Sequence, residues 1–330
     1  DSANADHVVR HRIVINRITA NSMEPRGCIG EYDRIDDLYN IRCTIQSAHS
    51  TRAVLAGAYF RKPQKHFRVI CENMGGGFGM KGGCYPEYVL SLWAAEVTGR
   101  PVKWIAERSE GILSDEQARD SVVEAELALD KHGKFLGLRS LAKTAMGAYN
   151  TTDRNVNPTI VALSCLVNTY KTPTIHARVM GIFTNTMTIA FYRGGGRPEP
   201  LYIIERLVDK PARQLGVDPI DLRRRNCIPS EDMPYRTPLD RIYDCGDFLK
   251  NMDDCRRIAD YDSASVRREE ARQRGKILGI GFANVCEPSA GRAFEHAEIR
   301  FDPSGSVTIL TGAMDHGQGH GTTFKQVLSD

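Results

Sequence analysis

Three glycine-rich turns constrain the fold of this 330-residue chain more than any other feature of its sequence. They are residues 75–81 (GGGFGMK), 192–197 (YRGGGR) and 316–321 (HGQGHG), and each runs into a segment with a helix-start pattern. Glycine tolerates positive φ and lets the backbone approach a ligand closely. The start of a helix offers unpaired N–H groups and partial positive charge to an anion. One such turn is weak evidence, but three predict a large, phosphate-bearing cofactor held mostly by main chain.

Composition excludes several classes of function. The chain carries 44 basic and 41 acidic residues, for a net charge of +3, and shows no basic face that would indicate nucleic acid. Arg223-Arg224-Arg225 lies close to Asp218 and Asp221, so we expect a solvated helix end there. No apolar run approaches the ~20 residues of a membrane-spanning helix.

The nine cysteines are scattered and form no C-x-x-C pair, so we expect neither a zinc ribbon nor an iron–sulfur cluster in this chain. They are typical of small buried side chains in a reduced, cytoplasmic setting. A periplasmic location remains an alternative, because the chain begins without a methionine. The chain also ends, at residues 324–330, on a helix that has barely begun. We therefore interpret the chain as a fragment of a longer polypeptide.

The predicted elements favour an α+β fold of mixed sheets with packed helices, because strands are both paired with one another and interleaved with helices. Pro86 and Gly99 bound a helical pattern, and residues 124–142 form a hairpin signal around a turn at 130–133. The predicted strands are 8–15, 66–71, 101–106, 124–129, 135–142, 175–183, 277–285, 295–301 and 307–310. The predicted helices are 86–98, one that begins at Pro198 and is kinked by Pro211, 218–225, 247–259 and 264–274.

Length and a proline-rich segment predict two domains. A chain of 330 residues is long enough to form two cores by the usual size relation. Residues 229–238 contain three prolines among mixed charges, which is typical of a linker. We expect a first domain at 1–230 and the start of a second, truncated domain at 231–330.

The first glycine turn admits a second interpretation. Residues 77–82 (GFGMKG) satisfy G-x-G-x-x-G between a predicted strand and a predicted helix, and Glu96 lies about twenty residues further on, as in a dinucleotide-binding fold. Against this, Glu72, Asn73 and Met74 separate the strand from the glycines, and Glu96 falls inside the helix. A nicotinamide-dependent dehydrogenase with a parallel sheet therefore stays as an alternative.

Side chains at the other two turns also have two interpretations. His316 and His320 have the i, i+4 spacing of a zinc site, but the glycines between them disfavour a helix, so we expect no metal ligand there. Arg197 can bind an anion, or it can pair with Glu199 or Glu205.

Six short segments are spread along nearly the whole chain. In order, they are 23–27 (MEPRG), 44–49 (TIQSAH), the first glycine turn, 99–104 (GRPVKW), 192–193 (YR) and 317–320 (GQGH). In that order they resemble the large, molybdenum-cofactor-binding subunit of the xanthine oxidase family of molybdenum hydroxylases. This family includes xanthine and aldehyde oxidoreductases and aerobic carbon monoxide dehydrogenase.

The resemblance implies a molybdopterin cofactor, in bacteria often its cytosine dinucleotide. The sulfurs of that cofactor hold the molybdenum, so no protein side chain is implied as a metal ligand. Gln46 is implied to hydrogen-bond a metal oxo group, and Arg193 to help close the site. The residues implied to contact the cofactor are Gln46, Gly76, Gly77, Phe78, Gly79, Arg193, Gln318 and Gly319.

The resemblance also implies hydroxylation of an electrophilic carbon with oxygen from water. Electrons would leave to an iron–sulfur subunit and an FAD-binding subunit, in a dimer of such heterotrimers. The family's catalytic base is a glutamate implied to lie beyond Asp330, so Glu287 is not a candidate. We therefore expect the chain by itself to be inactive, and a non-catalytic scaffold relative is a further alternative.

Two departures from the family patterns narrow the substrate. Carbon monoxide dehydrogenases of the molybdenum–copper type carry a cysteine where this chain has Gly194. Xanthine-specific enzymes carry a glutamate and a phenylalanine where it has Gly82 and Gly195. Carbon monoxide and purines are therefore disfavoured. An aldehyde or an N-heterocycle remains, and the sequence does not choose between them.

Overall fold

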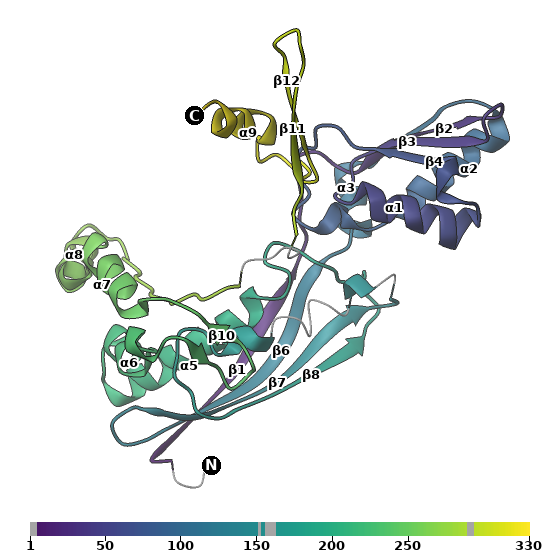
Figure 1. The fold of residues 1–330 in the computed structure, drawn as a ribbon. Coiled ribbons are helices and arrows are strands. Elements are labelled where there is room, and N and C mark those ends of the chain that lie inside the picture. Colours follow the sequence, from purple (N-terminus) through teal and green to yellow (C-terminus); the bar gives the residue numbers. More distant parts are fainter. Residues whose placement is uncertain (1–4, 151–152, 156–162, 289–293) are drawn as a thin grey trace.

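The structure is a computed structural model that describes residues 5–150, 153–155, 163–288 and 294–330. Within these ranges, two four-stranded mixed sheets carry most of the helices, and a two-stranded hairpin with one helix lies apart from them (Figure 1). Each sheet combines antiparallel pairs with one parallel pair. The predicted α+β fold is therefore confirmed.

The larger sheet contains β1 (His7–Ile18), β6 (Ala118–Leu129), β7 (Phe135–Gly147) and β8 (Ile175–Phe183), in that spatial order. β1, β6 and β7 are antiparallel, whereas β8 joins β7 in parallel. Alternate residues of a strand point to one face, so β6 buries Val123, Ala125 and Leu127 together. The predicted hairpin is present, and both of its strands are longer than their sequence signal.

One face of this sheet is covered by α5 (Pro198–Leu215), and α6 (Pro219–Asn226) packs on α5. α7 (Phe248–Ile258) and α8 (Ala264–Gln273) lie farther from the sheet (Figure 1). α5 packs directly on β1 and β6 (Figure 1). It buries Ile204, Leu207 and Val208. It continues as one helix through Pro211. Met252 of α7 belongs to the same hydrophobic core.

The smaller sheet contains β2 (Gly27–Asp33), β3 (Leu38–Cys43), β4 (Phe67–Ile70) and β5 (Val102–Ile105), in the order β4-β3-β2-β5. α2 (Pro86–Thr98) packs against it at Gly30, where an added Cβ would lie 2.8 Å from the Ser91 carbonyl oxygen. α2 ends at Gly99, whose φ of 65° is left-handed as a C-terminal cap requires. α1 (Ala48–Val54), a π-helical stretch (Leu55–Phe60) and α3 (Arg108–Ser114) complete this region.

The remaining elements are short. β9 (Tyr235–Arg236) pairs with β10 (Ile242–Tyr243), and β11 (Ala297–Phe301) pairs with β12 (Val307–Thr311) ahead of α9 (His320–Ser329). Single 3₁₀ turns occur at Gln64–His66, Met80–Gly82, Asp153–Asn155, Leu163–Leu166, Ser230–Asp232 and Tyr261–Ser263. Across the described part of the chain, no helix combines the length and the apolarity that a membrane span requires.

Two of the expectations about the fold are wrong. Residues 277–285 form no strand, because no neighbouring described strand pairs with them, and Ile277 is fully exposed. Arg223 is not solvated but fully buried, since its guanidinium lies between the carboxylates of Glu205 and Asp209, at 2.7 and 2.9 Å. A buried arginine needs such partners to offset its lost hydration.

Candidate functional site

Gln46, in the loop between β3 and α1, contacts two of the three glycine turns. Its backbone N–H donates to the Lys81 carbonyl at 2.8 Å, and its side-chain Oε1 accepts the Gly79 N–H at 2.8 Å. Its Nε2 lies 3.3 Å from Nδ1 of His316 in the third turn. One amide side chain therefore connects segments that lie far apart in sequence.

The first turn holds Gln46 in a cradle that only glycine leaves open. A Cβ added at Gly77 would lie 2.5 Å from the Gln46 amide, and one added at Gly79 would lie 2.6 Å from the Phe191 carbonyl oxygen. Gly76 and Gly79 have φ of 90° and 98°, which glycine adopts freely. Phe78 also has a positive φ, 51°, and its ring is half exposed at the tip of the turn.

The second turn lies against the first. The Arg193 N–H donates to the Phe78 carbonyl at 2.9 Å, and the Arg193 side chain is exposed. Gly194, Gly195 and Gly196 all have positive φ, so the chain reverses tightly before α5 begins at Pro198. The first turn differs: it continues into the 3₁₀ turn at Met80–Gly82, and α2 begins only at Pro86.

The expected partners of Arg197 are wrong. Arg197 donates to the Gly194 carbonyl at 2.9 Å and lies 3.6 Å from the Glu287 carboxylate. Glu199 and Glu205 are not available to it, because each is paired with another arginine.

The third turn is organised by a residue of its own loop. The Asp315 carboxylate accepts the N–H groups of Gly317, Gln318 and His320 at 2.8 to 2.9 Å. These bonds, that of Gly317 first, hold the pKa of the Asp315 carboxyl below its usual range. The expectation that this helix start offers its N–H groups to an outside anion is therefore not met in this structure. Gln318 and Gly319 are exposed.

His316 fits a bound acceptor beside Gln46. Burial, and then the neighbouring His320, lower the pKa of His316, so the ring is neutral at neutral pH. A neutral ring that accepts from Gln46 through Nδ1 carries its proton on Nε2. That Nε2 is buried and has no hydrogen-bond partner within the described residues. A ligand atom at this point would satisfy it.

Glu24 and Lys81 fasten the two ends of the first turn, and the sequence did not single them out. One carboxylate oxygen of Glu24 accepts the Gly75 N–H at 2.9 Å and the Lys81 ammonium at 3.0 Å. Lys81 is fully buried. Burial lowers the pKa of its ammonium, and the ion pair with Glu24 opposes that shift. Glu24 lies in the 23–27 motif, but no local pattern predicts a contact across 57 residues.

A cavity of about 360 Å³ opens beside Gln46. Phe191 and Gly79 line it, together with Arg154, whose guanidinium donates to the Gly79 carbonyl at 2.6 Å and to Glu116 at 3.0 Å. A Cβ added at Gly82 would lie 2.4 Å from this guanidinium. The guanidinium thus lies where a side chain at position 82 would begin.

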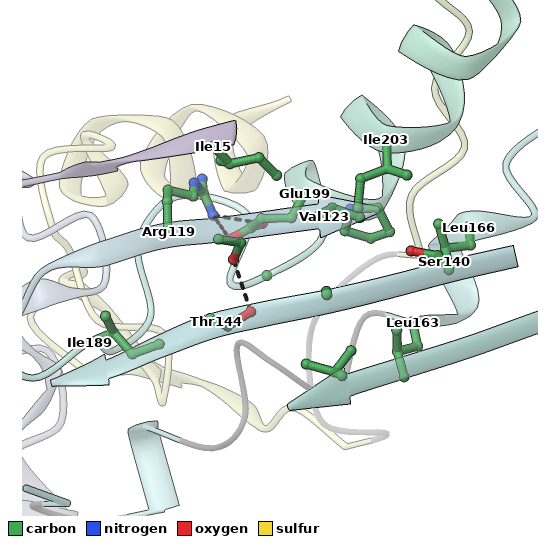
Figure 2. A pocket seen from close by; sticks show the side chains of 15 residues that line it. Ile15, Arg119, Val123, Ser140, Thr144, Leu163, Leu166, Ile189, Glu199 and Ile203 are labelled. Atoms are coloured by element: carbon green, nitrogen blue, oxygen red, sulfur yellow. Dashed lines mark hydrogen bonds and ion pairs between the residues drawn. The ribbon is translucent and has the colours of Figure 1, made fainter. Parts of the chain in front are cut away.

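A smaller cavity, of about 40 Å³, lies behind the second turn, between the larger sheet and the start of α5. Figure 2 shows Arg119 of β6 and Glu199 of α5 pointing toward one another at its edge. Ser121 and Thr144, which also line it, face each other on β6 and β7 and share a hydrogen bond of 2.9 Å. The volume is too small for a substrate and is enough for water.

The dinucleotide alternative is not supported. β4, which precedes the first turn, is an edge strand of a sheet with two antiparallel pairs. A dinucleotide fingerprint opens a helix directly, whereas α2 begins four residues after Gly82. The first turn also contacts the second turn directly, and Gln46 links it to the third turn, so it does not stand alone.

Comparison with known proteins agrees with this geometry. Residues 1–227 match a family model described as a molybdopterin cofactor-binding domain, and residues 254–330 match a second model with that description. In Paenarthrobacter nicotinovorans, the 6-hydroxypseudooxynicotine dehydrogenase complex subunit gamma is 31% identical and the nicotine 6-hydroxylase large subunit 32% identical, each over 99% of this chain and 42% of the relative.

Two further proteins are similar over the same length. The carbon monoxide dehydrogenase large chain of Hydrogenophaga pseudoflava is 32% identical over 99% of this chain and 43% of its own. The solved structure of quinoline 2-oxidoreductase from Pseudomonas putida 86 superposes with a TM-score of 0.90, at 30% identity, over 99% of this chain and 43% of that one. The chain therefore spans about two-fifths of the length of these relatives.

Proposed function

Because the chain belongs to the molybdopterin cofactor-binding domain family, we propose that its three glycine turns and Gln46 hold that cofactor in the large subunit of a molybdenum hydroxylase. The observation that carries the proposal is the convergence at Gln46 of the Gly79 N–H, at 2.8 Å, and the His316 ring, at 3.3 Å. The contact of Arg193 with Phe78 adds the second turn to the same place.

The described residues fit an anionic cofactor approached by main chain. The cradle at Gly77 and Gly79 excludes side chains, and the orphaned Nε2 of His316 offers a donor beside Gln46. In the proposed site, Gln46 donates its remaining amide N–H to a metal oxo group, and Arg193 supplies positive charge at the rim. Gly76, Gly77, Phe78 and Gly79 line the metal side of the cofactor, and Gln318 and Gly319 contact the pterin. When bound, molybdopterin supplies the two-electron oxidation.

The substrate that we propose is an N-heteroaromatic ring, hydroxylated at a ring carbon: R–H and water give R–OH, two protons and two electrons. Two similar proteins are named for such rings, nicotine and quinoline. The cavity of about 360 Å³ beside Gln46 presents Phe191 for ring contact. Gly194 lacks the thiol that would hold copper for carbon monoxide. An aldehyde is the second candidate.

The proposal includes partners. The two electrons require acceptors, and we propose an iron–sulfur subunit and an FAD-binding subunit, in a dimer of such heterotrimers. Relatives named as a complex subunit gamma and a large chain support a multi-subunit assembly. The catalytic base is a glutamate outside residues 1–330, so the chain alone is expected to bind cofactor without turnover.

Purification of the full-length protein, followed by metal analysis and cofactor extraction, tests this function. We expect stoichiometric molybdenum and a pterin, with or without a cytosine nucleotide. Incubation with quinoline and with benzaldehyde, each in H₂¹⁸O with a dye acceptor, then separates the substrate classes. Protein that is free of molybdenum and loaded with a nicotinamide nucleotide would overturn the proposal. Turnover of the aldehyde alone would show that the substrate is an aldehyde and not an N-heteroaromatic ring.

A further inference from the structure

We propose that Arg119 is a positioning residue that sets the second glycine turn, and with it Arg193, through an ion pair with Glu199. The inference rests on the proposed function only in taking Arg193 as part of the cofactor site. Its structural basis is a buried side-chain contact that none of the sequence motifs includes.

Arg119 contacts the turn from three directions. Its Nη1 lies 3.0 Å from both carboxylate oxygens of Glu199, on the first turn of α5. Its Nη2 donates to the Arg193 carbonyl at 2.7 Å. Its guanidinium also lies 5.6 Å from the centre of the Tyr192 ring. The side chains of Arg119 and Glu199 are only 10% and 13% exposed, so solvent screens this pair little.

The backbone at Arg119 adopts a strained conformation next to this contact. Arg119 and Asp120 have φ of 69° and 70° inside β6, a left-handed conformation that non-glycine residues rarely adopt in a strand. Pairing of β6 with β7 begins only at Ser121. Arg119 and Asp120 therefore lie outside that ladder, although β1 still pairs with Arg119 opposite Arg17. Their left-handed backbone turns the Arg119 side chain toward the second turn.

Arg17 of β1 holds the strained backbone in place. It donates to the Asp120 carboxylate at 2.9 Å, to Gln117 at 3.0 Å and to the Met187 carbonyl at 2.7 Å. Backbone bonds of Gln117 with Thr188, at 3.0 Å, and with Ala190, at 2.7 Å, join the same strand to the segment that enters the turn. Strain persists where its surroundings over-determine it, and such positions cluster at functional sites.

The test is amide hydrogen exchange of the full-length protein, followed in the peptide that covers residues 191–197. Arg193, Gly195 and Arg197 each donate a backbone hydrogen bond there. We expect Arg119→Met to speed exchange on the order of tenfold, because local opening becomes easier. Arg119→Lys keeps the charge and one donor and should restore part of the protection. The matched control is Glu126→Gln on β6, the strand of Arg119. This change removes the ion pairs of Glu126 with Arg10 and Arg139, whose side chains are exposed.

Arg119→Gly separates positioning from backbone strain, since glycine adopts φ of 69° freely. We expect rapid exchange at 191–197 in this variant even if its thermal midpoint rises. Wild-type protection at 191–197 in Arg119→Gly, or equal protection in the Lys and Met variants, would overturn the proposal. Molybdenum content of the wild-type protein is measured in parallel. Its absence would count against the proposed function and would leave the exchange result valid.

Discussion

The first and third glycine turns look alike in sequence, but they are held in different ways. The first is fastened by residues from distant segments: Glu24 at its ends, Gln46 in its cradle and the Arg193 backbone at its tip. The third is fastened mainly by Asp315, within its own loop, and it reaches a distant residue through the contact of His316 with Gln46. A glycine turn that depends on long-range contacts is fixed by the fold, whereas one capped by its own carboxylate needs only its local sequence.

The largest effect is expected at Gln46, which links the first and third turns. Gln46→Ala removes the acceptor of the Gly79 N–H and the contact with His316. In the full-length enzyme we expect kcat to fall on the order of 10²–10³-fold, as when one preorganised donor is removed from an active site. The measurement is steady-state kinetics with quinoline. The control is Gln64→Ala, an exposed glutamine, and an unchanged kcat in Gln46→Ala would remove this residue from the site.

A matched pair of glycine variants tests directly whether the first turn is more constrained than the third. Gly79→Ala places a methyl group 2.6 Å from the Phe191 carbonyl oxygen at a φ of 98°, and we expect a loss of roughly 3 kcal/mol of stability. Gly319→Ala meets nothing within 4 Å at a φ of 76°, and we expect about 1 kcal/mol. Thermal unfolding measures both. Equal losses would mean that the first turn is no more constrained than the third.

The pair of Glu24 and Lys81 allows a test of the long-range fastening. Glu24→Gln leaves the buried Lys81 ammonium without its carboxylate, and we expect a loss of roughly 1–3 kcal/mol. Glu72→Gln, which breaks an exposed pair with Arg42, should cost little, because such pairs contribute little. The thermal midpoints of the two variants measure this difference in stability. Loosening in Glu24→Gln should also appear as faster exchange at residues 75–81, and no change there would contradict the fastening.

Local signals predicted much of the fold. The hairpin of β6 and β7, the strand β8 and the bounds of α2 follow from turn residues, alternation and caps. The ordered motifs likewise identified Gln46 and all three turns as candidates for one site. The strand expected at 277–285 was wrong, because an alternating pattern becomes a strand only when a partner pairs with it.

Contacts between distant residues could not be predicted. Arg119 and Glu199 lie 80 residues apart. Arg119 belongs to no motif, and the sequence offered Glu199 as a partner of Arg197 instead. Arg223 looked like a solvated charge, because a sequence does not show that Glu205 and Asp209 of α5 face it. Burial of a charge is decided by which helices pack together, and that information is tertiary.

The smallest effect is expected at the third turn, and it depends on pH. The folded-state pKa of Asp315 is below its ordinary value, so its stabilisation of the turn is complete above that value and is lost as pH falls through the folded pKa. Asp315→Asn imitates the loss of charge at neutral pH. We expect faster amide exchange at residues 317–320 and no change at 75–81, because α9 is exposed and carries little of the fold. Coupled loosening of both turns in this variant would show that they act as one unit, and the distinction between local and long-range fastening would fail.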